Sequence, residues 1–210
     1  MSNNLAYQID NPPSEENAPC GEIIGGKRVP WREEIIGGEV VAMAPGSSNH
    51  NRVKKNITWI FETYLRGKPR EFLPDGEGLY LAEDEDEFIP DGMIVCDPDK
   101  IQKDGVHGAP DLVVEVLSPG TARYDKGRKK DMYEKHGVRE YWIVSPDGLY
   151  VEQYVLTDGR FVLRDIYYRC DPHDGERMNP KERAAIKKEF QCTLYDDLTI
   201  RVDDIFERVA

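Results

Sequence analysis

The chain has 210 residues, which fits one domain with an extension or two small domains. Hydrophobic residues make up 39% and charged residues 32%, as in ordinary globular proteins, and no apolar run approaches the roughly 20 residues that cross a bilayer. The net charge of −12 excludes a uniformly basic surface, although basic residues concentrate in segments 50–70 and 121–140.

The two ends of the chain and its cysteines set further expectations. We expect residues 1–30 to be a polar tail, disordered or loosely docked, and residues 31–210 to form one domain with a polar insert at about 170–190. The start has no basic segment followed by an apolar block, so it is not a secretory signal. Four scattered cysteines without a CxxC pair favour free thiols over disulfides or zinc, which predicts a cytoplasmic protein.

The first half of the chain alternates strand and helix patterns. Residues 34–43 predict two short strands that turn at Gly37-Gly38. Apolar residues at helical spacing predict an amphipathic helix from about Asn49 to Leu65, with a basic first turn. Strands are then expected at 78–81 and 88–95, and the acidic run 83–87 between them reads as a solvated hairpin loop.

The second half begins with the strongest strand pattern in the chain. Residues 110–117 are apolar on both faces, as a central strand should be. We expect a helix at about 125–136 that ends at Gly137, a strand at 141–144 and a β ribbon to about 168. A short helix at 180–189, a strand at 198–200 and a final helical turn at 202–206 would follow. This order predicts an α/β fold, of the α+β type, with a mixed sheet flanked by helices.

Glu115 is the most informative residue, because it interrupts an apolar strand on the face of Val113 and Leu117. A buried carboxylate is costly unless it is paired or bound to a metal. Asp91 follows Pro90 at the start of another apolar strand, and adjacent strands could bring both carboxylates to one end of a sheet. Such oxygen ligands suit Mg²⁺ or Mn²⁺. Alternatively, Glu115 forms a structural ion pair, and Asp91 belongs to a Pro-Asp-Gly turn.

Lys129 is the third candidate. Asp125, Lys129 and Tyr133 share one face of the predicted helix, and this face should point into the core. Lys126 and Lys130 fall on the other side and are candidates for an exposed basic patch. An inward ammonium could orient an attacking water or offset charge on a phosphate. A plain buried ion pair with Glu115 is the alternative.

The runs Pro110–Pro119 and Gly137–Val144, together with Tyr124-Asp125, Lys129 and Tyr133, resemble the Uma-type restriction endonuclease family of the PD-(D/E)xK nuclease superfamily. The resemblance covers about 31–168 and 194–206. It implies a restriction-endonuclease-like core in which Asp91 and Glu115 are the metal carboxylates. The superfamily's usual lysine two residues after that Glu is absent, because Leu117 stands there, and Lys129 matches the lysine that replaces it in this branch. Glu39 matches a further acidic position.

The leading hypothesis is therefore a metal-dependent endonuclease that hydrolyses phosphodiester bonds, with a nucleic acid, expected to be DNA, as its partner and Mg²⁺ or Mn²⁺ as its cofactor. Asp91, Glu115 and the Val116 carbonyl would hold the cation, Lys129 would orient water, and Glu39 and Asp125 would be accessory. Near the first helix, His50 is interpreted as a surface or capping residue instead of a catalytic one. The nucleic-acid backbone would contact basic residues of the two helices: Arg52, Lys54, Lys55, Arg123, Lys126, Arg128 and Lys130.

Two other functions stay open. The acidic balance and Leu117 favour a non-catalytic module that keeps the fold and binds nucleic acid or protein. A hydrolase of another kind could use Asp91 and Glu115 as an acid–base pair, and it would work in excess chelator. A homodimer is expected only insofar as two sites are the simplest way to cut both strands of a duplex.

Overall fold

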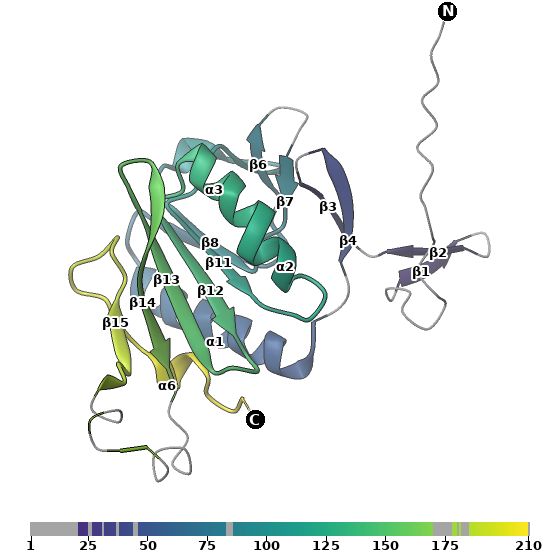
Figure 1. Ribbon diagram of the computed structural model, residues 1–210. Coiled ribbons are helices and arrows are strands. Elements are labelled where there is room, and N and C mark those ends of the chain that lie inside the picture. Colours follow the sequence, from purple (N-terminus) through teal and green to yellow (C-terminus); the bar gives the residue numbers. More distant parts are fainter. Residues whose placement is uncertain are drawn as a thin grey trace, which may run out of the picture.

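The computed structural model describes residues 21–24, 27–30, 32–36, 38–43, 46–82, 86–169, 178–179, 181 and 185–209. Its centre is a mixed six-stranded sheet (Figure 1). In spatial order the strands are β14 (Arg160–Tyr168), β13 (Tyr150–Thr157), β12 (Glu140–Ser145), β11 (Leu112–Val116), β8 (Gly92–Val95) and β5 (Glu71–Pro74). β11 pairs with β12 in parallel and with β8 in antiparallel fashion, and all five of its residues are buried, which confirms the predicted central strand.

The long helix α1 (Ser48–Leu65) covers one face of this sheet (Figure 1). Ser47 caps it by accepting a hydrogen bond from the His50 amide at 3.2 Å, as the serine run before the helix allows. Val53, Ile57 and Phe61 form its buried stripe and pack with Trp142 of β12 in one apolar core.

The opposite face carries a helical segment built from three pieces: α2 (Ala122–Tyr124), a π-helical turn η3 (Asp125–Lys129) and α3 (Lys130–His136). The helix therefore begins slightly before the predicted start, and Gly137 ends it with φ 86°, as expected. Tyr133 packs against Tyr141 of β12 in a second apolar core. The π turn is a local widening that recurs near functional sites.

A second six-stranded sheet lies beside α3 (Figure 1). Its spatial order is β4 (Glu39–Met43), β3 (Arg32–Ile36), β7 (Asp86–Phe88), β6 (Leu79–Ala82), β10 (Gly105–His107) and β9 (Ile101–Gln102). The short helix η2 (Pro98–Lys100) precedes β9. The predicted antiparallel pair β3–β4 is confirmed, while Gly37 of its turn lies outside the described residues. The single strand expected at 88–95 is wrong, because β7 ends at Phe88 and pairs with β6 in this sheet, whereas β8 begins at Gly92 and belongs to the central sheet. The acidic loop is shorter than predicted, because Asp86 and Glu87 already belong to β7, and 83–85 lie outside the described residues.

The ends of the chain bring two corrections. β1 (Gly21–Ile24) and β2 (Lys27–Pro30) form an antiparallel hairpin, so the disordered alternative is wrong for these residues, while 1–20 lie outside the described part. The helix expected at 180–189 falls largely on residues that are not described, and its end is wrong, because Glu189 begins strand β15 (Glu189–Gln191). β15 pairs with β16 (Thr199–Arg201), which leads into α6 (Val202–Ile205) as predicted.

Within the described residues, no helix is long and apolar enough to cross a membrane.

Candidate active site

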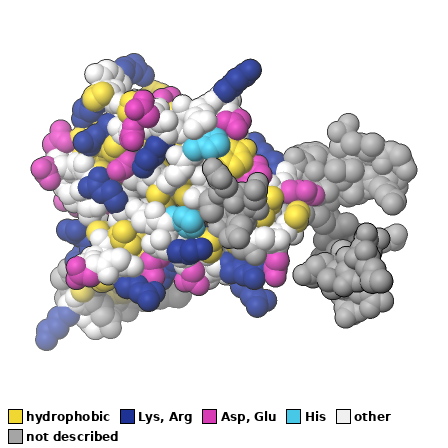
Figure 2. All heavy atoms as spheres, turned by 90° about the horizontal axis from the view of Figure 1, so that it is seen from above, with side chains coloured by type: hydrophobic (Ala, Val, Ile, Leu, Met, Phe, Trp, Pro, Cys, Tyr) yellow, Lys and Arg dark blue, Asp and Glu magenta, His cyan; other side chains and the backbone are white. Residues whose placement is uncertain are grey.

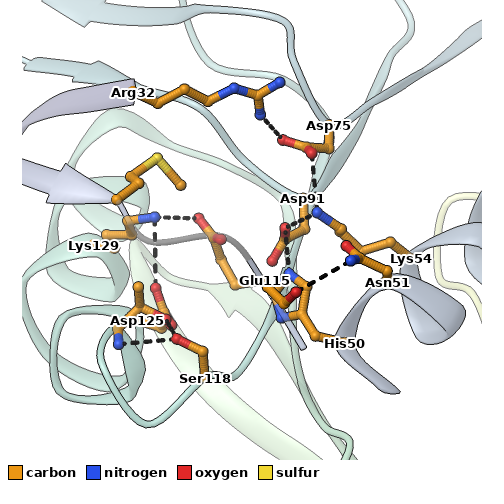
Figure 3. Close-up of a pocket in the computed structure, with 13 residues that line it drawn as sticks. Arg32, His50, Asn51, Lys54, Asp75, Asp91, Glu115, Ser118, Asp125 and Lys129 are labelled. Atoms are coloured by element: carbon orange, nitrogen blue, oxygen red, sulfur yellow. Dashed lines mark hydrogen bonds and ion pairs between the residues drawn. The ribbon is translucent and has the colours of Figure 1, made fainter. Parts of the chain in front are cut away.

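Asp91 and Glu115 reach the same pocket because of the strand register. Gly92 pairs with Val114, so Asp91, one residue earlier on an antiparallel strand, lies beside the end of β11 that carries Glu115. The Val116 amide donates to Asp91 Oδ2 at 2.7 Å and fixes this arrangement. Both carboxylates line a pocket of about 270 Å³ between α1 and the η3 turn (Figure 3).

Asp91 is held as a carboxylate by groups from α1. His50 Nε2 lies 3.2 Å and Lys54 Nζ 3.4 Å from Asp91 Oδ1. Burial alone would raise the pKa of Asp91, but His50, Lys54 and the Val116 amide together lower it below its ordinary value. His50 is therefore a buried residue of the pocket, and its interpretation as a surface or capping side chain is wrong; the cap is Ser47.

Glu115 belongs to a buried cluster around Lys129. The Lys129 Nζ lies 2.9 Å from Glu34 Oε1, 3.1 Å from Glu115 Oε1 and 3.5 Å from Asp125 Oδ1, and all four side chains are at most 4% exposed. The Tyr133 hydroxyl also donates to Glu115 Oε1 at 2.7 Å. The inward direction predicted for Asp125, Lys129 and Tyr133 is thus confirmed.

The charges of this cluster do not balance. Three carboxylates face one ammonium, so full ionisation would leave an excess of negative charge in a buried place. Burial raises the pKa of Glu115 well above its ordinary value, although Lys129 opposes the shift. Burial likewise raises the pKa of Asp125 to about 6. For Lys129, burial would lower the pKa, but the three carboxylates raise it above the ordinary range.

The chemistry of these residues fits a hydrated divalent cation. Mg²⁺ commonly binds one or two carboxylates and keeps several waters, and Asp91 and Glu115 supply that number. A nearby cation would also favour ionised Glu115 over the protonated form. No group of three or more His, Cys, Asp and Glu side chains is arranged as a metal cage in the described part of the chain. Because the two candidate ligands are carboxylates, the pocket suits Mg²⁺ or Mn²⁺, which prefer oxygen ligands.

Sequence reasoning missed Glu34 and chose Glu39 instead. Glu39 is exposed and pairs with Arg128 on the surface, away from the pocket lining. Glu34 is buried, pairs with Lys129 and accepts the Ile89 amide at 2.8 Å. Period two along β3 places Glu34 on the same face as buried Ile36, but the doublets Glu33-Glu34 and Ile35-Ile36 hid which face was buried.

The predicted nucleic-acid contacts divide into separate groups. Lys54 lines the pocket, whereas Arg52, Lys55 and Arg123 are exposed. Arg128 pairs with Glu39 and Lys126 with Glu152, while Lys130 lies over the Tyr154 ring. Figure 2 shows a face on which described Lys and Arg side chains alternate with acidic ones instead of forming one continuous patch.

The fold is a mixed α/β core of the restriction-endonuclease-like type. In the crystal structure of a protein described as a putative nuclease belonging to DUF820, from Anabaena variabilis, the same fold recurs with a TM-score of 0.63. That similarity extends over 85% of this chain and 91% of the other, at 14% sequence identity, so it speaks for the fold alone.

The chain belongs to the Uma2 family, described as "Putative restriction endonuclease", whose profile matches residues 27–185. Two proteins of Synechocystis sp. are similar in sequence. "Uncharacterized protein slr1290" is 28% identical over 200 residues, which cover 92% of this chain and 96% of that protein. "Uncharacterized protein sll1609" is 29% identical over 139 residues, covering 64% and 78% respectively.

Proposed function

We propose that the protein is a metal-dependent endonuclease that hydrolyses phosphodiester bonds in DNA. The observation that carries the proposal is the pocket in which Asp91, Glu115 and Lys129 meet at the ends of β8, β11 and η3 (Figure 3). Membership of the Uma2 family supports the same reaction class.

Each residue has a role that follows from its surroundings. Asp91 and Glu115, with the Val116 carbonyl at the end of the same strand, would hold Mg²⁺ or Mn²⁺. When bound, such a cation supplies Lewis-acid stabilisation of the phosphate and a more acidic water. Lys129 holds Glu115 in place at 3.1 Å and, from the pocket wall, can orient water or offset developing charge. Glu34 and Asp125 hold Lys129 in turn.

The backbone of the substrate would meet the exposed basic residues Arg52, Lys55 and Arg123. Lys126 and Arg128 have carboxylate partners, so a phosphate would have to compete for them. These contacts are to phosphates and would not read sequence. A homodimer and a cytoplasmic location remain part of this proposal.

The test is cleavage of plasmid and single-stranded DNA with Mg²⁺, Mn²⁺ or chelator. Wild type should cut only with a cation, and Glu115→Gln and Asp91→Asn should lose cutting while remaining folded. Glu62→Gln, an exposed acid on α1, is the matched control and should cut normally. Cutting in excess chelator, or full activity in both site variants, would refute the proposal.

A further inference from the structure

Lys54 differs from the other basic residues of α1. Arg52 and Lys55 are exposed, but Lys54 turns into the pocket, where its side chain is 16% exposed (Figure 3). A general role in holding nucleic acid, which suits the exposed pair, does not explain this position.

Two carboxylates hold the Lys54 ammonium. Its Nζ lies 2.9 Å from Asp75 Oδ2 and 3.4 Å from Asp91 Oδ1, so the contact with Asp75 is the closer one. Asp75 Oδ1 also accepts from Arg32 at 2.5 Å, which fixes that carboxylate between two cations. Lys54 thus has an anchor outside the proposed metal site and a second contact inside it.

A lysine ammonium and a divalent cation compete for the same carboxylate, because both are attracted by its negative charge. Lysine is a compact charge on a flexible stem, so it can exchange one oxygen partner for another while its anchor stays in place. A phosphate in the pocket offers oxygens that accept hydrogen bonds from such an ammonium.

We propose that Lys54 competes with the cation for Asp91 and, once the cation is bound, contacts the substrate phosphate while Asp75 holds it. The inference rests on the proposed function, since it needs a cation at Asp91 and a nucleic-acid substrate. Lys54 is then a phosphate-binding residue of the site, and Asp75 and Arg32 are positioning residues. Two effects of opposite sign follow from removing the ammonium.

The first effect concerns the cation alone. Titration calorimetry with MnCl₂ should show Lys54→Met binding Mn²⁺ about three- to tenfold more tightly than wild type, because a competing partly buried charge is gone. Lys135→Met removes the same charge from an exposed position on α3, where solvent screens it and where no contact with substrate is proposed. Its Mn²⁺ affinity should stay within about twofold of wild type.

The second effect concerns DNA. Affinity for a phosphorothioate duplex, which resists hydrolysis, is measured with and without Mn²⁺. Wild type and Lys135→Met should both gain affinity when Mn²⁺ is added. In Lys54→Met the gain in DNA affinity on adding Mn²⁺ should be at least about threefold smaller than in wild type, although Mn²⁺ itself binds more tightly. Lys54→Arg keeps the charge and should stay close to wild type in both measurements.

The outcomes separate the two proposals. If wild type binds no Mn²⁺, the proposed metal site is refuted together with this inference. If wild type binds Mn²⁺ but Lys54→Met does so equally or less tightly, or keeps the full gain in DNA affinity, only the role of Lys54 is refuted. Lys54→Gln serves as a second variant, with the same expected effects, should Lys54→Met not fold.

Discussion

Asp125 offers the sharpest test of the charge imbalance around Lys129. Its pKa of about 6 in the folded chain compares with an ordinary value of 3.8, and burial is the main cause. A shift of this size corresponds to about 3 kcal/mol. A raised pKa means that the stability contributed by this group is fully present below pH 4 and is lost as the pH rises through 6.

Asp125→Asn removes the titration while keeping the shape. Relative to wild type, the free energy of unfolding of the variant should therefore rise by about 3 kcal/mol between pH 4 and pH 7.5. The absolute gain at pH 7.5 will be smaller, since a buried amide must find its own hydrogen-bond partners. Urea unfolding of the cation-free protein at several pH values measures the difference. Asp131→Asn, an exposed acid on α3, is the control and should show no such trend.

A difference between Asp125→Asn and wild type that does not change with pH would refute the reasoning. It would mean that the buried carboxylates are compensated in some other way. Addition of Mn²⁺ at pH 7.5 should narrow the difference, because a bound cation stabilises the wild-type cluster more than the variant.

Three further predictions concern other contacts. Lys129→Met should lower the free energy of unfolding in urea at pH 7.5 by about 3–5 kcal/mol, because it leaves buried carboxylates without their cation. Lys130→Met should lower it by under about 1 kcal/mol, and equal losses in the two variants would contradict the buried ion-pair cluster. Burial would raise the pKa of Asp111, but the Cys96 amide and Arg139 lower it overall. Asp111→Asn should therefore lower the free energy of unfolding at pH 7, and this difference from wild type should disappear as the pH falls below 4. A difference that is unchanged at pH 3 would contradict the lowered pKa. A Cβ at Gly46 would lie 2.4 Å from the His50 ring, so Gly46→Ala should displace His50 and reduce the rate of DNA cleavage by about tenfold or more, with little change in the urea midpoint. A normal kcat in this variant would refute the importance of the His50 ring.

Much of the fold could be predicted because its signals are local. The apolar run of β11, the helical spacing of α1 and the glycine after α3 each follow from a few neighbouring residues. Glu115 was identified for the same reason, since a charge inside an apolar strand is visible without any tertiary information.

The missed site residues depend on contacts between distant segments. His50 meets Asp91 across 41 positions in sequence, and Glu34 of strand β3 in the second sheet meets Lys129 of the η3 turn. The residues next to His50 in sequence do not show whether its imidazole caps the helix or points into a pocket. Spacing predicted that Asp125 and Lys129 share a face, but it could not reveal that 125–129 form a π turn, in which the Asp125 carbonyl accepts a hydrogen bond from the Tyr141 hydroxyl at 2.9 Å.

Glu34 joins the second sheet to the site, so the cluster around Lys129 is complete only while strand β3 is in place. Its carboxylate accepts the Ile89 amide and contacts Lys129, so the strand β3 must be docked for either contact to exist. Hydrogen exchange at Ile89 would then report the opening of β3, residue by residue and without any substrate. If β3 opens far more often than the central sheet unfolds, a folded molecule would spend part of its time with an incomplete cluster, and exchange would count that fraction directly.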